Sequence, residues 1–237
     1  MQAAGHPVRW RLLGELARSD RQVHELTALV DEQQSLLSYH LGRLRESDLV
    51  RTRRSAADGP DIHYRLALAR CRDLLGAAGA ALHPALRGAT PPAPAPSPAR
   101  VLFLCTGNSS RSQMAEALLR RRSGGAVAAF SAGSRPKPVN PDSVAVMAAR
   151  GIDLTGAHPK HLDEFSGERF DRVITLCDRV PGGVPRIPRP AGGRALEHAR
   201  PGRRTGRPAF ERAADDVAER IEFLLHVLAA EPILEGS

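Results

Sequence analysis

A run of prolines and alanines near the middle of the chain constrains the fold more than any other feature of the sequence. Residues 83–99 read HPALRGATPPAPAPSPA and show no apolar periodicity. Proline fixes its own φ angle and has no backbone N–H, so such a run is typical of an extended, semi-rigid linker. We therefore expect a first domain over residues 1–82, a linker over residues 83–99 and a second domain over residues 100–237.

The charge of the chain favours a nucleic-acid partner only weakly. The 237 residues carry a net charge of +8 with an isoelectric point near 10.5, a balance typical of proteins that bind nucleic acid. However, residues 181–205 hold six arginines against one acid, which is a net +5 of that total. DNA binding must therefore be argued from a motif.

The small number of cysteines and the lack of long apolar segments indicate a protein of a reducing, aqueous compartment. Cys71, Cys105 and Cys177 are too few for a disulfide scaffold, so we expect a cytoplasmic protein whose thiols serve chemistry or packing. The sequence contains no run of about 20 apolar residues. Its start also lacks the apolar segment of a signal peptide. We predict no membrane segment and no metal site.

The first 82 residues combine helical patterns with a hairpin pattern. Apolar residues recur at helical spacing in three segments, residues 6–19, 21–30 and 33–47. Two short strand patterns around Asp58-Gly59 then give a hairpin signal. In the third helix Leu37, Leu41 and Leu44 would face the core. That spacing leaves a set of polar side chains facing solvent, namely Gln34, Ser35, Ser38, Tyr39 and Arg43.

This order of elements is the layout of a winged helix-turn-helix domain. Its third helix would enter the major groove of DNA, and its basic hairpin would contact phosphates. The segment LLSYHLGRLRESDLV resembles the recognition helix of ArsR-type repressors, with matching Ser38, His40, Leu41, Leu44, Leu49 and Val50. The candidate DNA-binding residues are Gln34, Ser35, Ser38, Tyr39, His40, Arg43, Arg51, Arg53 and Arg54. For His40 a structural role is the equal alternative.

The resemblance implies a transcriptional regulator that binds a DNA operator as a homodimer, joined through terminal helices such as residues 68–82. Arsenite-sensing members carry a cysteine pair on the second helix, where this chain reads RQVHEL. Cys71 alone cannot bind arsenite as a trithiolate, so the inducer site is unassigned. A small helical domain that binds a protein partner is the alternative for this half of the chain.

The second half opens with a thiol placed between a buried strand and a helix. The apolar run RVLFLC ends at Cys105, and SQMAEALLRRR continues at helical spacing. The C-x5-R loop between them can wrap an oxyanion with successive backbone N–H groups, and the helix N-terminus adds positive potential. The same field stabilises a thiolate, so Cys105 is the expected nucleophile. The candidate oxyanion-binding residues are Thr106, Gly107, Asn108, Ser109, Ser110 and Arg111.

Individual residues around this loop have separate expected roles. Arg111 can hold two oxygens of an oxyanion through its guanidinium, and Ser112 can donate a hydrogen bond to the thiolate. Gly107 permits a tight turn. Asn108 tolerates a left-handed conformation and can brace the loop from inside.

This half resembles the low-molecular-weight protein tyrosine phosphatase superfamily, and most closely its arsenate reductase branch. The resemblance lies in four sequence segments, VLFLCTGNSSRSQMAEALL, FSAGS, PDSVAVMAARGIDLTGAHPKHL and FDRVITLC. The resemblance implies a doubly wound α/β fold, in which a parallel sheet carries the loop at the carboxyl end of a strand. It also implies that the ligand is arsenate or a phosphate-like oxyanion.

The reduction of arsenate requires a second thiol. Cys105 would attack arsenic with loss of water, and a second thiol would then release arsenite and leave a disulfide. Cys177 ends the pattern RVITLC and matches the second thiol of the arsenate reductases, although a small buried residue at a strand end is the other interpretation. Electrons would come from thioredoxin, or from a low-molecular-weight thiol with a glutaredoxin-like partner.

Two parts of the family pattern are missing. Thioredoxin-linked reductases carry a third cysteine seven residues after the one matched by Cys177, and Val184 stands there. This favours the low-molecular-weight thiol for the chain as written. The superfamily's general acid is an Asp-Pro aspartate ahead of the last helix, but no aspartate occurs between Arg179 and that helix. Loss of a general acid typically costs about 10²–10⁴ in rate, so we expect poor turnover.

Residues 181–205 depart from the pattern, and we hypothesise that they are a frame-shifted translation. Codons for PGGVPR, read one nucleotide later, can give REVCP and restore the third cysteine. In the same frame, codons for ALEHARP can give HWSMPDP and restore the Asp-Pro. A genuine arginine-rich loop is the alternative. Sequencing the gene decides, because the hypothesis fails if the nucleotides cannot encode these residues.

Three functions are consistent with these residues. The leading interpretation is an ArsR-type regulator fused to a thiol-dependent arsenate reductase. A protein tyrosine phosphatase fused to the same DNA-binding domain would need Cys105, Arg111 and an acid, but no second thiol. A transcription factor whose second domain only senses an oxyanion would bind arsenate or phosphate without turnover.

Overall fold

The computed structural model describes residues 5–54, 62–83, 99–176 and 206–230. The chain divides into two compact units, residues 1–91 and residues 92–237. Most of the expected linker, residues 84–98, and all of the off-pattern segment 181–205 lie outside the described residues. Among the described helices, none combines the length and the apolar character needed to cross a membrane.

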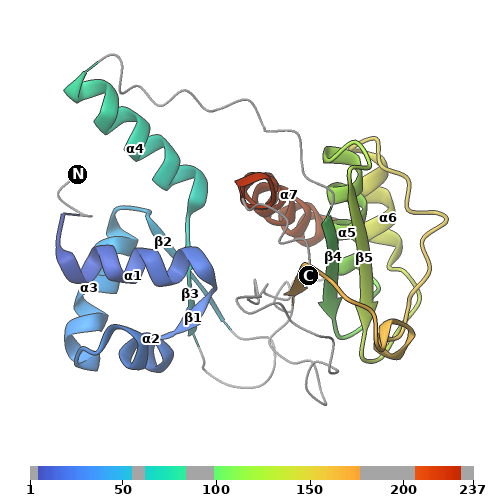
Figure 1. The fold of residues 1–237 in the computed structure, drawn as a ribbon, viewed down its shortest axis with the longest axis horizontal. Coiled ribbons are helices and arrows are strands. Elements are labelled where there is room, and N and C mark those ends of the chain that lie inside the picture. Colours follow the sequence, from blue (N-terminus) through green and yellow to red (C-terminus); the bar gives the residue numbers. More distant parts are fainter. Residues whose placement is uncertain (1–4, 55–61, 84–98, 177–205, 231–237) are drawn as a thin grey trace, which may run out of the picture. The chain divides into compact units, whose positions relative to one another are not determined.

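The described part of the N-terminal unit contains helices and a small antiparallel sheet (Figure 1). Its helices are α1 (Pro7–Arg18), α2 (Val23–Val30), α3 (Gln34–Glu46) and α4 (Leu68–Leu82), and its strands are β1 (Arg21–Gln22), β2 (Val50–Arg54) and β3 (Ile62–Leu66). Strand β3 lies between β1 and β2. The antiparallel pairing of β2 with β3 sets Thr52 opposite Tyr64. The predicted winged helix-turn-helix layout is confirmed.

The predicted apolar stripes of the first three helices form the core of this unit. Leu12 from α1, Leu26 from α2, and Leu37, Leu41 and Leu44 from α3 are fully buried. Burying one leucine side chain contributes roughly 1.5–3 kcal/mol, so these stripes decide which helix faces turn inward. The opposite face of α3 is exposed.

The C-terminal unit contains a parallel sheet with helices packed against it (Figure 1). Its described strands are β4 (Ala99–Cys105), β5 (Val127–Gly133) and β6 (Arg172–Thr175), with β4 in the middle. Its described helices are α5 (Arg111–Arg122), α6 (Pro141–Ala148) and α7 (Arg207–Ala230), with a 3-10 turn at Leu162–Phe165. Both strand pairs are parallel, which confirms the predicted α/β architecture.

Successive side chains of β4 point to opposite faces of the sheet and enter two different cores. Phe103 packs in one core with Leu119 of α5 and Ile221 of α7. Leu104 packs in the other core with Phe165 and Phe170. Because both faces are buried, the strand sequence is continuously apolar rather than alternating.

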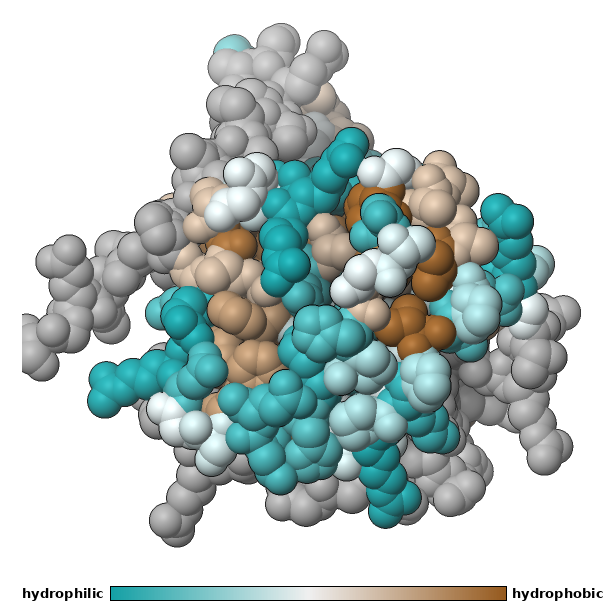
Figure 2. All heavy atoms as spheres, turned by 90° about the vertical axis from the view of Figure 1, so that its right-hand side faces the viewer, coloured by the Kyte–Doolittle hydropathy of each residue, from teal (hydrophilic) through white to brown (hydrophobic). Residues whose placement is uncertain are grey.

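The outer surface of this unit is mixed in character. Figure 2 views it from the side that carries α6, where hydrophilic side chains are interspersed with smaller apolar patches. Scattered apolar groups of this kind are ordinary on a solvated surface.

Candidate active site

The thiol lies at the carboxyl end of the central strand, beside the N-terminus of a helix. Strand β4 ends at Cys105 and α5 begins at Arg111, so the intervening loop and the helix N-terminus meet at one pocket. The pocket has a volume of about 240 Å³. It is lined by Cys105, Thr106, Gly107, Ser109, Ser110, Arg111, Met114, Lys137, Phe210 and Ala213.

Hydrogen bonds from a neighbouring segment fix the direction of the loop peptides. Three backbone N–H groups donate to loop carbonyls: Arg135 to Thr106 at 2.8 Å, Lys137 to Gly107 at 2.9 Å and Asn140 to Ser109 at 2.8 Å. In a trans peptide the C=O and the following N–H point in opposite directions. The N–H groups of Gly107 and Ser110 therefore point away from that segment and toward the inside of the loop, where an oxyanion would accept from them.

The Cys105 sulfur makes two hydrogen-bond contacts, and the Arg111 side chain lines the same pocket. The Ser112 Oγ atom lies 2.9 Å from the sulfur, and the backbone N–H of Asn108 donates to it at 3.1 Å. The Arg111 side chain is buried, and it donates to the carbonyl oxygen of Leu176. A guanidinium in the same pocket suits an oxyanion, so the pocket combines a thiol with an anion-binding group.

Asn108 braces the loop from inside, as predicted, and its side chain does not line the pocket. The residue is fully buried and has a φ angle of 43°, a left-handed conformation that asparagine tolerates. Its Nδ2 donates to Ser112 Oγ at 2.9 Å and to Ser131 Oγ at 2.8 Å. Its Oδ1 accepts from the backbone N–H of Lys160 at 2.7 Å. Its side chain is thus used inside the loop and its backbone N–H donates to the Cys105 sulfur, so its part in oxyanion binding stays a prediction.

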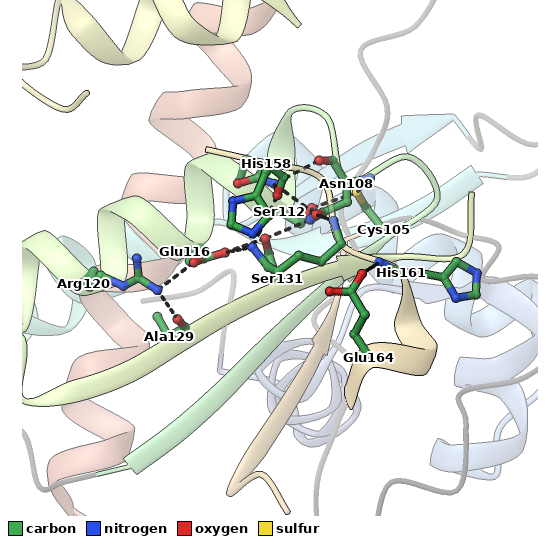
Figure 3. A network of polar contacts seen from close by, with 12 residues as sticks. Cys105, Asn108, Ser112, Glu116, Arg120, Ala129, Ser131, His158, His161 and Glu164 are labelled. Atoms are coloured by element: carbon green, nitrogen blue, oxygen red, sulfur yellow. Dashed lines mark hydrogen bonds and ion pairs between the residues drawn. The ribbon is translucent and has the colours of Figure 1, made fainter. Parts of the chain in front are cut away.

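Sequence reasoning missed several residues that shape this loop. A Cβ atom on Gly133 would lie 2.8 Å from the Asn108 nitrogen and 2.9 Å from the Thr106 oxygen, so glycine lets β5 end against the loop. Ser131 and Glu116 join Asn108 in a polar network (Figure 3). The quoted motifs FSAGS and RSQMAE contained these residues, but neither motif shows that they meet.

The two thiols among the described residues, Cys71 and Cys105, have different surroundings. Cys71 is half-buried in the N-terminal unit, and burial raises the pKa of its thiol, which makes it a weaker nucleophile. Cys177 lies outside the described residues. Leu176, the residue before it, donates from its backbone N–H to the Leu104 oxygen at 2.6 Å.

Most of the side chains predicted to contact DNA are exposed, on α3 and at Arg51 of β2. Exposed side chains at predicted positions are Gln34, Ser35, Ser38, Tyr39, Arg43 and Arg51. The side chain of Arg54 lies outside the described residues. Contact of these exposed residues with DNA stays a prediction.

The prediction that His40 contacts DNA is wrong, because its side chain is in the interior. His40 is 3% exposed, and its ring stacks on that of His6 with 4.4 Å between centroids. On α3 it follows Leu37 by three residues and precedes Leu44 by four, which places it on the core face. Burial, together with His6 and Arg9, lowers the pKa of His40.

The prediction that Arg53 contacts phosphate is also wrong. Its Nε atom lies 3.1 Å from Oδ2 of Asp20, and the two side chains are only 7% and 3% exposed. A buried carboxylate needs a compensating charge, and Arg53 supplies it. The two hairpin arginines therefore differ in role. Arg51 is exposed and can contact DNA, whereas Arg53 is buried in an ion pair with Asp20.

Comparisons with known proteins agree with the family predicted for each half of the chain. Residues 100–232 match the family described as low molecular weight phosphotyrosine protein phosphatase, and residues 6–52 match the bacterial regulatory protein, arsR family. An arsenate reductase of Brevibacillus brevis is 34% identical over 122 residues, which are 52% of this chain and 90% of that protein. A glutaredoxin arsenate reductase of Synechocystis sp. is 37% identical over 78 residues, 33% of this chain and 60% of that protein.

A solved structure described as an arsenate reductase in the phosphate binding state is 30% identical, with a TM-score of 0.45. The match covers 55% of this chain and 98% of that one.

Proposed function

The chain belongs to the low molecular weight phosphotyrosine protein phosphatase family, and from this premise we propose that its C-terminal unit is a thiol-dependent arsenate reductase and its N-terminal unit an operator-binding domain. The observation that carries the proposal is the position of Cys105 in a pocket with Arg111, where its sulfur contacts the Ser112 hydroxyl and accepts from the Asn108 backbone N–H. The Brevibacillus relative named arsenate reductase, which this chain matches over 90% of its length, supports arsenate as the oxyanion.

The proposed reaction oxidises two thiols and reduces one arsenic atom. The Cys105 thiolate attacks As(V) of arsenate, so that an S–As bond forms while an As–O bond breaks, and the departing hydroxyl takes a proton from solvent and leaves as water. A second thiolate then attacks the Cys105 sulfur and forms a disulfide as the S–As bond breaks. The bonding electron pair stays on arsenic, which leaves as arsenite, As(III). Arg111 and the loop N–H groups would hold the remaining oxygens.

We assign the second thiol to Cys177 from its position in the sequence. An external thiol must reduce the resulting disulfide. For the chain as written, we propose a low-molecular-weight thiol with a glutaredoxin-like partner, because Val184 occupies the place of the third cysteine that thioredoxin-linked reductases carry. If the gene encodes cysteine there, thioredoxin becomes the expected donor.

Reductant consumption on addition of arsenate tests this proposal. Purified protein should consume reductant with small thiols and glutaredoxin, and Cys105→Ser should abolish the reaction. Cys177→Ser should also abolish arsenate reduction, yet spare hydrolysis of p-nitrophenyl phosphate, which needs no second thiol. Absence of turnover with every donor, thioredoxin included, would reject the proposal. Arsenate turnover retained by Cys177→Ser would remove that residue from the mechanism.

For the N-terminal unit we propose operator DNA as the partner, read through the exposed face of α3. The arsR-family match supports DNA as the partner. The exposure of Ser38, Tyr39 and Arg43 supports this face as the contact surface. Binding through phosphates releases counterions, so operator affinity should fall steeply with salt. A fluorescence-anisotropy titration at several salt concentrations measures this. An affinity insensitive to salt would contradict phosphate contact.

We also propose that the N-terminal unit forms a homodimer through α4. This helix has no fully buried residue, and Leu75 on it is 55% exposed. Leu75 lines an apolar pocket together with Trp10 of α1, which is 58% exposed. Covering this surface with a second copy would remove it from water. Leu75→Glu should shift the protein from dimer to monomer in analytical ultracentrifugation, and a wild-type monomer at micromolar concentration would reject the dimer.

A further inference from the structure

The pocket around Cys105 contains a second cation, Lys137, beside Arg111. Lys137 lies in the segment between β5 and α6 and is exposed. Its backbone N–H donates to the Gly107 oxygen at 2.9 Å, which holds its main chain against the loop. Prolines precede and follow it, and proline restricts both its own backbone and that of the residue before it. The flexible side chain of Lys137 therefore starts from a stiff and anchored position.

The stem of the Lys137 side chain lies over the loop. A Cβ atom added to Gly107 would lie 3.9 Å from both Cγ and Cδ of Lys137, which is ordinary van der Waals contact. The ammonium follows Cδ by a single methylene group, and Lys137 lines the pocket, so this charge can reach a ligand there. No acidic side chain of the described residues pairs with the ammonium. Its charge is therefore available to a ligand.

The charges that line the pocket are few and can be added up. Among the described lining residues only Cys105, Arg111 and Lys137 can carry a charge, and none is a carboxylate. Arg111 is buried and also donates to the carbonyl oxygen of Leu176, so part of its donor capacity is used within the protein. With Cys105 as a thiolate, Arg111 alone would leave the lining neutral. Lys137 makes it positive.

We propose that Lys137 is a specificity-determining residue that favours oxyanions with two negative charges over oxyanions with one. A phosphate group carries about −1.5 to −2 charges at pH 7, and arsenate is the same kind of tetrahedral oxyanion. Coulomb energy is proportional to the charge of the ligand, so the ammonium attracts a dianion twice as strongly as a monoanion at the same distance. Met114, Phe210 and Ala213 line the same pocket, and such apolar groups screen the attraction less than open water does. The inference rests on the proposed function only in taking the pocket around Cys105 as the oxyanion site.

Protection of Cys105 from iodoacetamide by inorganic anions tests this inference without turnover. Sulfate is a tetrahedral dianion, perchlorate is a tetrahedral monoanion, and iodoacetamide is uncharged. The measured quantity is the concentration of sodium sulfate or sodium perchlorate that halves the rate of Cys105 alkylation near neutral pH, at constant ionic strength. Mass spectrometry of the peptide that contains Cys105 gives the rate. Each variant is referred to its own rate without anion, which removes any direct effect of the substitution on the thiol.

Lys137→Met removes the ammonium and keeps an unbranched stem over Gly107. We expect the half-protecting sulfate concentration to rise about tenfold, the lower end of the effect of one lost hydrogen bond between charged groups, because the ammonium is exposed. The perchlorate concentration should rise only about threefold, because half the ligand charge gives half the Coulomb free energy and so the square root of the factor. Lys137→Arg keeps the charge, so its sulfate concentration should stay within about threefold of the parent.

Arg169→Met is the matched control. Arg169 is exposed and precedes β6, which runs parallel to β4, so it lies at the amino end of the sheet, opposite the end that carries Cys105. The seven residues of β4 span roughly 20 Å, which is about two Debye lengths at 0.1 M salt. This variant has the same net charge as Lys137→Met but should leave protection by both anions at the parent values. Circular dichroism melts check that all variants are folded.

An unchanged sulfate concentration in a folded Lys137→Met protein would overturn the inference. Equal changes for sulfate and perchlorate would overturn it too, because they would reflect a rearranged loop rather than a lost charge, as would a Lys137→Arg protein that binds sulfate as weakly as Lys137→Met. Absence of protection by either anion in the parent would reject the oxyanion site and the proposed function with it. If the anions follow the expected pattern while no donor supports arsenate turnover, the reductase proposal is rejected and the role of Lys137 stands.

Discussion

His40 is a buried histidine whose ring nitrogens have no hydrogen-bond partner among the described residues. Burial is the main reason that its pKa lies below the ordinary value of 6.5, and neighbouring His6 and Arg9 act in the same direction, whereas Glu32 opposes them. The folded state therefore keeps His40 neutral at pH values where the unfolded chain already binds a proton. The free energy of unfolding of the N-terminal unit should fall as the pH drops below about 6.5.

Fluorescence of Trp10, the chain's single tryptophan, reports unfolding of that unit because Trp10 lies on α1. Thermal melts at about pH 7.5 and about pH 5, on either side of the ordinary histidine pKa, should show a smaller acid-induced loss in His40→Gln than in the parent. Equal losses in the two proteins would show that His40 does not carry the effect.

Gly133 is the residue at which strand β5 meets the anion loop. Gly133→Ala would place a methyl group 2.8 Å from the Asn108 nitrogen, closer than any ordinary contact, so the loop or the strand end must move. Overpacking of this kind typically costs about 1–3 kcal/mol. We expect a lower melting temperature of the C-terminal unit and weaker protection by phosphate against Cys105 alkylation. Gly156→Ala is the control, since nothing lies within 4 Å of its added Cβ. Similar behaviour of the two variants would contradict this reading of the loop.

Two of the arginines of strand β2, Arg51 and Arg53, have different surroundings. Arg53 neutralises Asp20 in the interior, whereas Arg51 is exposed. Removing one partner of a buried ion pair typically costs about 3–5 kcal/mol, because the other charge stays buried without compensation. Arg53→Ala should therefore destabilise the N-terminal unit by an amount of that order, measured by urea unfolding monitored through Trp10.

Arg51→Ala is the matched substitution on the same strand. It should leave stability unchanged within about 0.5 kcal/mol and lower operator affinity similarly for all sequences, with the salt slope reduced by about one. A destabilising Arg51→Ala, or a harmless Arg53→Ala, would reverse the assignment of the two residues.

At the scale of the whole molecule, each unit has its own hydrophobic core. The two proposed activities should therefore be separable by single substitutions. Cys105→Ser should lose arsenate reduction and keep operator affinity within about twofold, while Arg51→Ala should show the reverse, because each site draws on the packing of its own unit. Anisotropy titrations and reductant-consumption assays on the same preparations measure both activities. Loss of operator affinity in Cys105→Ser without any ligand would show that the units depend on each other.

Patterns within a few residues determined much of this protein. Helical spacing in the first half predicted α1, α2 and α3, and the Asp58-Gly59 signal predicted the pairing of β2 with β3. A strand, a C-x5-R loop and a helix in succession predicted where Cys105, Arg111 and Ser112 would meet. These features are local, because backbone geometry and side-chain periodicity are set by neighbours in sequence.

Only the tertiary structure decided the rest. Asp20 and Arg53 are 33 residues apart in the sequence, and Lys160 contacts an Asn108 that lies 52 residues earlier. Sequence spacing cannot show which charge is buried and which partner compensates it, because that depends on which surfaces pack together. For the same reason the spacing of apolar residues placed the leucines of α3 in the core, but it left His40 open between a structural role and DNA contact. The His6 ring, at the N-cap of α1, packs against the His40 ring, and burial, rather than residue type, determined the role of His40.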